Sequence, residues 1–187
     1  MQTLGQSDST PRTESRWRSL FWPTIRNQGD LDYVTREGLW LCYLVAAVTV
    51  VMSSVSGFPA SGVFEGVFYF LAGVGVRQRN RFAGIAAFLG YLLSGFVLQR
   101  YAGNGFGVVR IFFLALLFAN IRGNWLAARW ATEEQLDFAP PRLDQTLADK
   151  LADQLPIWLW PKVRIAFYII AGLELLFLLL ELFAPLP

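Results

Sequence analysis

The sequence contains no histidine and a single cysteine. Without histidine, the chain cannot form a His-ligated haem, the usual zinc and di-iron sites, or a Ser-His or Cys-His nucleophile. Cys42 lies in an apolar stretch, where a thiol behaves as a small apolar side chain, and it has no partner for an intrachain disulfide. No HExxH pattern and no cluster of catalytic carboxylates occurs. We therefore expect no metal, no other cofactor and no enzymatic activity.

Charge is also scarce, since the formal net charge is only +2. No basic stripe covers any predicted helix, which argues against nucleic acid as a partner. Apolar side chains are abundant instead: they make up 55% of the 187 residues, more than a soluble core of this size can bury. The lipid bilayer is therefore the expected surroundings of the chain.

Five apolar runs have the length of membrane-spanning helices. The predicted fold class is all-α: a polytopic membrane helix bundle of about five transmembrane helices with a short cytoplasmic amphipathic helix. The first four helices are predicted to form a bundle over residues 38–124, and residues 162–187 form the fifth. The runs cover about residues 38–56, 60–76, 82–98, 106–121 and 163–183.

Three segments lie outside these runs. Residues 1–15 are polar and predict a disordered tail, whereas residues 16–37 mix Arg with Trp and Phe, as expected at the headgroup level. Within the latter, Gly29-Asp30-Leu31-Asp32 reads as a turn and N-cap of a helix that continues into the membrane. Residues 125–161 are predicted to be a cytoplasmic acidic amphipathic segment.

Basic residues predict how the chain is threaded. Of its 16 Lys and Arg, all except Arg100 and Arg110 lie at alternate ends of the runs. The run Arg77-Gln78-Arg79-Asn80-Arg81 reads as a stop-transfer and orientation signal rather than a site for nucleic acid or anionic lipid. The positive-inside rule then places the N-terminus in the cytoplasm, and the loops at Gly57 and Gly103 and the C-terminus outside.

Small residues recur in the third run. Ala86, Gly90 and Ser94 are spaced by four, which predicts a thin helix face for close packing against another helix rather than a ligand site. The glycines from Gly103 to Gly107 lack the strand and the Lys of a phosphate-binding loop, so they predict a turn between helices.

A leucine stripe is the clearest feature of the acidic segment. Leu143, Leu147, Leu151 and Leu155 recur every four residues and predict one apolar side on a short helix. That side packs on the protein's own cytoplasmic face or the lipid surface, or it docks a partner protein. Both alternatives stay open at this point.

Three ionisable groups lie inside the spans, where charge is costly. Glu65 and Arg110 are at similar depth in the second and fourth runs, so we expect an intramembrane ion pair between the two helices; the alternative is that each side chain extends separately to the interface. Glu174 lies near the middle of the fifth run, and Glu181 shares its face seven residues on. Such a carboxyl is expected to be protonated or hydrogen-bonded to a neighbouring helix. Glu174 and Glu181 would then form a polar face that holds the fifth helix to the bundle, or a route for protons or cations.

Three short motifs carry a resemblance to a known group of proteins. The chain resembles bacterial multi-span membrane proteins of uncharacterised function, in which a segment with Asn and Arg-Gly closes the last helix of a four-helix unit. Related units also occur beside signal-peptidase-like domains, but no position here matches their serine-lysine machinery, so that activity is not implied. The resemblance implies a bacterial source and an inner-membrane location. It extends over about residues 22–130, with a further match beyond them, and rests on Phe21-Trp22-Pro23-Thr24-Ile25, Phe118-Ala119-Asn120-Ile121-Arg122-Gly123-Asn124-Trp125 and Leu159-Trp160-Pro161-Lys162.

Taken with the threading, these features favour an accessory or scaffold subunit of the bacterial inner membrane that docks a protein partner through the leucine stripe. A homo-oligomer is the other expected association. The alternative function is a small transporter or channel subunit that uses Glu174, Glu65 and Arg110.

Overall fold

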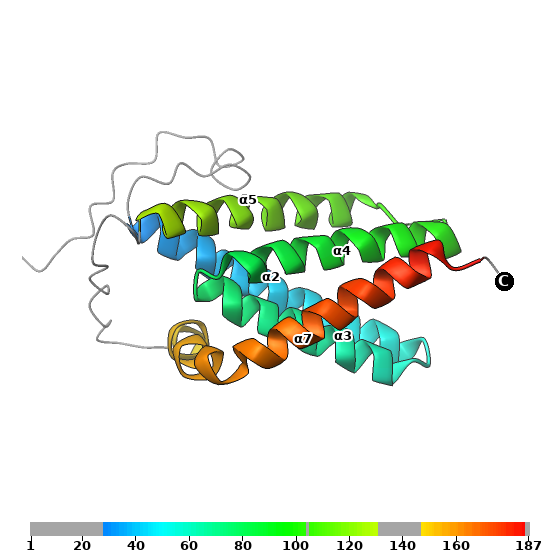
Figure 1. Ribbon diagram of the computed structural model, residues 1–187, viewed down its shortest axis with the longest axis horizontal. Coiled ribbons are helices and arrows are strands. Elements are labelled where there is room, and N and C mark those ends of the chain that lie inside the picture. The colour runs from blue at the N-terminus through cyan, green and yellow to red at the C-terminus, as the bar shows by residue number, and fades with distance from the viewer. Residues whose placement is uncertain (1–27, 104, 131–146, 186–187) are drawn as a thin grey trace, which may run out of the picture.

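All the structure that can be described is helical. The computed structural model describes residues 28–103, 105–130 and 147–185, and it contains no strand in these ranges. The predicted tail, the interfacial residues before Gln28 and residues 131–146 of the acidic segment, Leu143 included, lie outside them. The helices are α2 (Gln28–Val55), α3 (Pro59–Arg77), α4 (Arg81–Ala102), α5 (Val108–Trp130), α6 (Leu147–Asp149), the π-helix η1 (Lys150–Gln154) and α7 (Leu155–Phe183) (Figure 1).

Five helices in these ranges are long and apolar enough to cross a membrane, which confirms the predicted fold class. The chain therefore has the architecture of a multi-pass membrane protein. Two boundaries differ from the prediction. Helix α2 already includes Gly29 and Asp30, so this pair is not the turn before the helix. The fifth helix begins at Leu155 and continues directly from η1, without a separate amphipathic helix between them.

The four helices α2 to α5 form a bundle, and α7 lies on α3 and α4 (Figure 1). Helix α3 has the central position, because it contacts α2, α4 and α7. Of the most apolar 18 residues of α3, 56% are buried, whereas the corresponding share for the span that includes α7 is 22%. We call the end that holds Arg77, Arg79 and Arg81 the basic end. The loops at Gly57 and Gly103 and the last turn of α7 lie at the opposite end.

Glycines allow α2 and α3 to pack closely. A Cβ atom added at three positions of α3 would meet a side chain of α2: Gly62 meets Ser53, Gly66 meets Val50 and Gly73 meets Cys42. Close backbone approach of this kind is the usual way in which helices associate in lipid, where the hydrophobic effect does not drive them together. The pair α2 and α3 is thus a stable unit on which α4, α5 and α7 pack.

The predicted small-residue face of α4 turns toward α3. Gly90 is buried, and a Cβ atom there would lie 2.7 Å from Cε1 of Phe68 and 3.4 Å from the Tyr69 hydroxyl oxygen. Ala86 is buried in the same cluster of side chains, whereas Ser94 is only partly buried. Gly90 therefore leaves room for two aromatic residues of α3 at the centre of the bundle.

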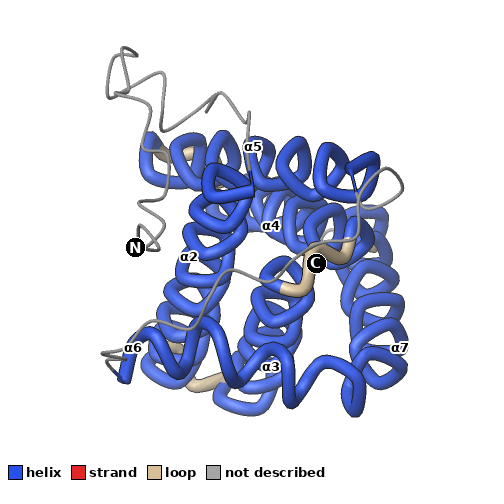
Figure 2. The backbone as a smooth tube through the Cα atoms, turned by 90° about the vertical axis from the view of Figure 1, so that its left-hand side faces the viewer, coloured by secondary structure: helices blue, strands red, loops and turns tan. Residues whose placement is uncertain are grey.

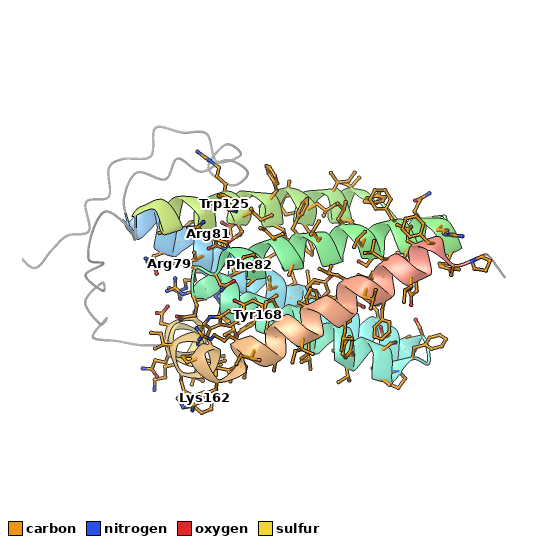
Figure 3. The ribbon with its side chains drawn as sticks, viewed as in Figure 1. Arg79, Arg81, Phe82, Trp125, Lys162 and Tyr168 are labelled. Atoms are coloured by element: carbon orange, nitrogen blue, oxygen red, sulfur yellow. The ribbon has the colours of Figure 1, made fainter. Side chains whose placement is uncertain are left out.

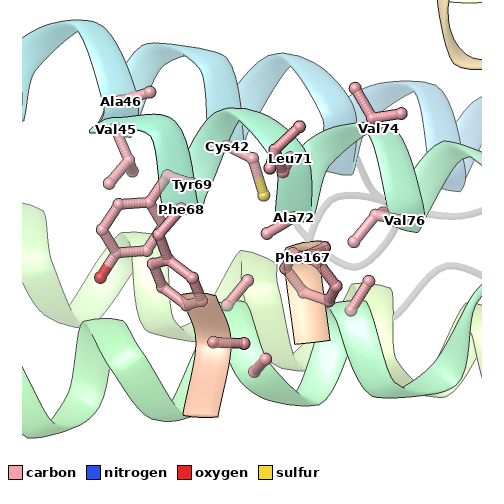
Figure 4. Close-up of a cluster of buried hydrophobic side chains, with 14 of the residues drawn as sticks. Cys42, Val45, Ala46, Phe68, Tyr69, Leu71, Ala72, Val74, Val76 and Phe167 are labelled. Carbon is pink, nitrogen blue, oxygen red and sulfur yellow. The ribbon is translucent and has the colours of Figure 1, made fainter. Parts of the chain in front are cut away.

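Aromatic side chains fill the middle of the bundle between α3 and α7 (Figure 4). The rings of Phe68 and Phe167 stack with centroids 6.3 Å apart, and neither side chain is exposed. Trp160 contacts Phe167 at 5.5 Å and continues the cluster toward the basic end. We call Phe68, Phe167 and Trp160 the aromatic layer.

The chain crosses the basic end before α7 enters the bundle. In Figure 1, α6 and η1 are seen nearly end-on, and Figure 2 shows the same residues and the first turns of α7 running across the end of the bundle. Pro161 lies inside α7, where a proline removes a backbone hydrogen bond and bends the helix. We call residues 147–160 the transverse segment.

The close packing of α2 and α3 can be tested at Gly73. A Cβ atom there would lie 2.9 Å from Cβ of Cys42 and 3.2 Å from the carbonyl oxygen of Leu39, and neither atom can move without the backbone. We expect Gly73→Ala to lower the free energy of unfolding in detergent by about 1–3 kcal/mol. The matched control is Gly172→Ala on α7, where nothing lies within 4 Å; this change is expected to be neutral or to stabilise by up to about 1 kcal/mol. Equal effects of the two substitutions would contradict the packing.

Candidate functional site

Arg77 is the last residue of α3, and its guanidinium binds the first turns of α2. Nη1 donates to the carboxylate of Asp32 at 2.5 Å, to the carbonyl oxygen of the same residue at 3.1 Å, and to the hydroxyl of Thr35 at 3.0 Å. Thr35 is itself buried and donates to the Asp32 carbonyl. These contacts hold the start of α2 in helical form, which explains why the helix includes residues that read as a turn in the sequence.

The same guanidinium also binds the transverse segment. Nη2 donates to the carboxylate of Asp153 at 2.6 Å, and Nε donates to the carbonyl oxygen of Ala152 at 3.0 Å. One planar group therefore joins α2, α3 and η1, and we call Arg77 with Asp32, Thr35 and Asp153 the arginine clamp. A guanidinium suits this role because it presents five N–H donors in a rigid fork.

Burial makes the clamp stronger than an ordinary surface ion pair. The side chain of Arg77 is 11% exposed, whereas those of Asp32 and Asp153 are 39% and 33% exposed. Water therefore weakens the ion pairs from the carboxylate side, but the cation is largely shielded. The sequence run from Arg77 to Arg81 indicated orientation only, and the clamp was not predicted from it.

The leucines of the predicted stripe point away from the bundle. Leu147 is 80% and Leu151 is 46% exposed, and Leu155 is partly buried. The opposite side of the transverse segment is covered by the bundle, since Ala152, Pro156 and Trp160 are buried. Leu147 and Leu151 are therefore not fully covered by the described helices, and the docking role of the stripe stays a prediction.

Other cations of the basic end contact aromatic rings. The guanidinium of Arg81 lies 5.3 Å from the ring centroid of Trp125, and Nζ of Lys162 lies 3.7 Å from that of Trp158. Figure 3 shows Arg79, Arg81, Trp125 and Lys162 gathered in the half of the bundle that carries the transverse segment. Burial lowers the pKa of Arg79 from its usual value, partly offset by the charge of Asp32. Alternating cations and aromatics are typical of a bilayer interface.

A second polar group lies within the bundle, on the other side of the aromatic layer. Glu174 of α7 is only 6% exposed. The ring of Phe64 lies 6.4 Å from that of Phe177, and these residues are close in sequence to Glu65 and Glu174. Since α3 and α7 are antiparallel, this contact and the Phe68–Phe167 stack place the two carboxyl groups at the same depth.

Tyr69 and Arg110 complete this group, which we call the polar cluster: Glu65, Tyr69, Arg110 and Glu174. Tyr69 stands one turn from Glu65 on the same face of α3 and is 1% exposed, and its hydroxyl lies beside that of Ser94 without a well-formed hydrogen bond. The charges of Glu65, Glu174 and Arg110 all act on that hydroxyl. The cluster thus joins α3, α5 and α7.

Arg110 makes its direct contacts with α4. Its Nη1 donates to the hydroxyl of Ser94 at 3.3 Å and to the carbonyl oxygen of Tyr91 at 3.4 Å, and its guanidinium lies 4.7 Å from the Tyr91 ring centroid. Its charge also acts on Glu65 through space. The predicted ion pair of Glu65 with Arg110 stays a prediction. Ser94 thus contributes to the contact with α5 as well as to the small face of α4.

Arg100, the other cation outside the basic end, caps α7. Its guanidinium donates to the carbonyl oxygens of Leu182 and Ala184, and the hydroxyl of Tyr101 donates to that of Glu181 at 3.3 Å. A cation at the last carbonyls of a helix is favoured by the helix dipole. The side chain of Glu181 is exposed, two turns from Glu174 toward the opposite end. The predicted polar face of Glu174 and Glu181 therefore connects a buried carboxyl with an exposed one.

Two asparagines of the motif that carried the family resemblance are buried in α5. Asn120 is 3% and Asn124 is 0% exposed, and they lie against Gly38 of α2 and Gly84 of α4. The amide of Asn120 donates to the carbonyl oxygen of Leu116 at 3.3 Å, whereas neither polar atom of the Asn124 side chain has a partner in the structure. Their spacing of four in an apolar run is the signal that could have placed them on one face.

The described residues contain no group of three or more His, Cys, Asp or Glu that could hold a metal ion. Comparisons with protein-family models, with curated proteins and with solved structures find no match to the chain. The resemblance to bacterial multi-span proteins therefore stays a prediction from its three motifs.

The arginine clamp predicts a difference between two neighbouring cations. Arg77→Lys keeps the charge but cannot reach α2 and η1 together, so we expect the free energy of unfolding in detergent to fall by about 1–3 kcal/mol. Trypsin should then cleave faster after the exposed Lys150, which follows directly on α6. Arg79→Lys is the matched control, expected within about 0.5 kcal/mol of the wild type because no hydrogen bond joins the Arg79 side chain to another described residue. Similar behaviour of both variants would count against the clamp.

Proposed function

We propose that the protein is a non-enzymatic accessory or scaffold subunit of a bacterial inner membrane, which docks a partner protein on the transverse segment. The observation that carries the proposal is the exposure of Leu147 and Leu151 on a segment whose other side is fastened by Arg77. A docking surface gains affinity when it is already held in place, because little ordering remains to be done on binding. The arginine clamp provides this preorganisation.

The proposed orientation places the basic end in the cytoplasm. Its support is the positive-inside rule, together with the behaviour of the two exceptions: Arg100 and Arg110 both donate hydrogen bonds within the bundle. Their positions are therefore explained by internal contacts and do not weaken the charge bias. The transverse segment would then face cytoplasmic partners.

Labelling of single cysteines tests the orientation. In a Cys42→Ala background, Ser56→Cys and Ala148→Cys place exposed thiols at opposite ends of the bundle. A membrane-impermeant maleimide added to spheroplasts is expected to label the first variant directly and the second only after the membrane is permeabilised. Labelling of Ala148→Cys in intact spheroplasts would reverse the proposed threading.

Photocrosslinking tests the docking. A photoreactive amino acid at Leu147 and at Leu151 is expected to yield the same discrete adduct with another protein in intact membranes. Val108 is the matched control, because it is apolar and 85% exposed but lies at the opposite end. Adducts only with lipid, or only with a second copy of the chain, would refute a protein partner on this surface.

The polar cluster favours a second candidate function, a small transporter or channel subunit that uses Glu174, Glu65 and Arg110. Its support is the convergence of ionisable groups from three helices at one depth. We rank it second because a transport route must reach both ends of the bundle, whereas Phe68 and Phe167 are fully buried beside the cluster. A proton or ion flux in proteoliposomes that is lost in Glu174→Gln would move this candidate to first place.

A further inference from the structure

The polar cluster has a charge imbalance that one small cation would remove. Two carboxyl groups lie at this depth, the charge of Glu65 acts on Glu174, and Arg110 supplies one guanidinium. Arg100 does not compensate them, because its guanidinium is bound to the carbonyl oxygens at the end of α7. With both carboxyls ionised, the cluster would carry an excess negative charge in a bundle surrounded by lipid, which is a costly state.

A buried phenol lies beside these carboxyls. The Tyr69 hydroxyl makes no well-formed hydrogen bond within the described residues, has the Ser94 hydroxyl as a hydrogen-bonding neighbour, and lies in the fields of both Glu65 and Glu174. A phenol can donate to a carboxylate and can accept from a protonated carboxyl. This hydroxyl is therefore placed to serve the two carboxyls as a donor or an acceptor.

The donor set fits a proton better than a metal ion. Cations such as Ca²⁺ take six to eight oxygen ligands, and the described residues hold no group of three acidic, Cys or His side chains. Two carboxyls that share a site commonly hold a single proton between them, because both cannot ionise at low cost. We propose that Glu65 and Glu174 together bind one proton, with Tyr69 and Arg110 as hydrogen-bonding and charged neighbours.

The surroundings of this site favour entry of the proton from one end of the bundle only. Toward the basic end, the aromatic layer of Phe68, Phe167 and Trp160 separates the carboxyls from the arginine clamp. Toward the opposite end, the side chain of Glu65 is partly exposed and that of Glu181 is exposed. The charge of Glu181 also acts on Glu174. The proton therefore enters and leaves from the end that holds the loops at Gly57 and Gly103.

Infrared spectroscopy of the full chain in proteoliposomes detects the bound proton. A carboxyl in contact with water is ionised at neutral pH, so we expect a C=O stretch from about one protonated carboxyl per chain, shifted in D₂O. The band should disappear in Glu174→Gln and in Glu65→Gln. It should persist in Glu181→Gln, the matched control on the same helix face. Absence of the band from the wild type at neutral pH, or its survival in both variants, would overturn the proposal.

A second measurement tests the entry from one end and needs no substitution. In proteoliposomes of known orientation, an alkaline jump on the side of the Gly57 loop is expected to remove the band of the wild-type protein, while the same jump on the basic side leaves it unchanged. Loss of the band from the basic side would contradict the closure by the aromatic layer. These outcomes do not depend on whether the transverse segment docks a partner.

Discussion

The forked geometry of one guanidinium, which binds two different carboxylates, sets the arrangement of the basic end. Arg77 closes α3, fixes the start of α2 through Asp32 and Thr35, and holds η1 through Asp153. Remove these bonds and the transverse segment would be joined to the bundle mainly by Ala152, Pro156 and Trp160. The entry angle of α7, and with it the position of Glu174, therefore depends on a contact made more than two turns away from the polar cluster.

The cations at the two ends of the bundle have different kinds of partner. At the basic end, Arg81 and Lys162 lie over indole rings, an arrangement that keeps the charge near water and the aromatic carbon near lipid. At the opposite end, Arg100 and Arg110 donate hydrogen bonds to oxygen atoms within the bundle. Arg100 and Arg110 therefore contribute to helix packing and carry little information about threading. If they are left out of the count of basic residues, the charge bias between the two ends of the bundle is clearer.

Sequence patterns were enough for the fold and for part of the site. The apolar runs predicted the five helices, because the thickness of the hydrocarbon core sets the length of a spanning helix whatever local contacts the helix makes. Glu65, Arg110 and Glu174 were recognisable because charge inside such a run is rare.

The clamp was not predictable, since Asp32, Arg77 and Asp153 are far apart in the chain and each looks like an ordinary interfacial residue. Tyr69 was missed for a similar reason: a tyrosine in an apolar run is common, and only the buried position of its hydroxyl near Glu65 and Glu174 distinguishes it. The pairing of α2 with α3 did have a signal, the Gly62 and Gly66 spacing of four.

Glycine positions link the close packing of the bundle to its chemistry. Gly90 on α4 leaves the space that Phe68 and the Tyr69 hydroxyl occupy, so the aromatic layer and the polar cluster both depend on the absence of one side chain there. The same helix supplies Ser94, one turn away, as a hydrogen-bond acceptor for Arg110. A thin helix face in lipid is usually explained by packing alone. Here it also brings a phenol, two carboxyls and a guanidinium close enough to act on one another, and rigid packing of α4 against α3 keeps them at that distance. Any change in the protonation of Glu65 and Glu174 would therefore act on the contact between α3 and α7, because these two helices carry the two carboxyls.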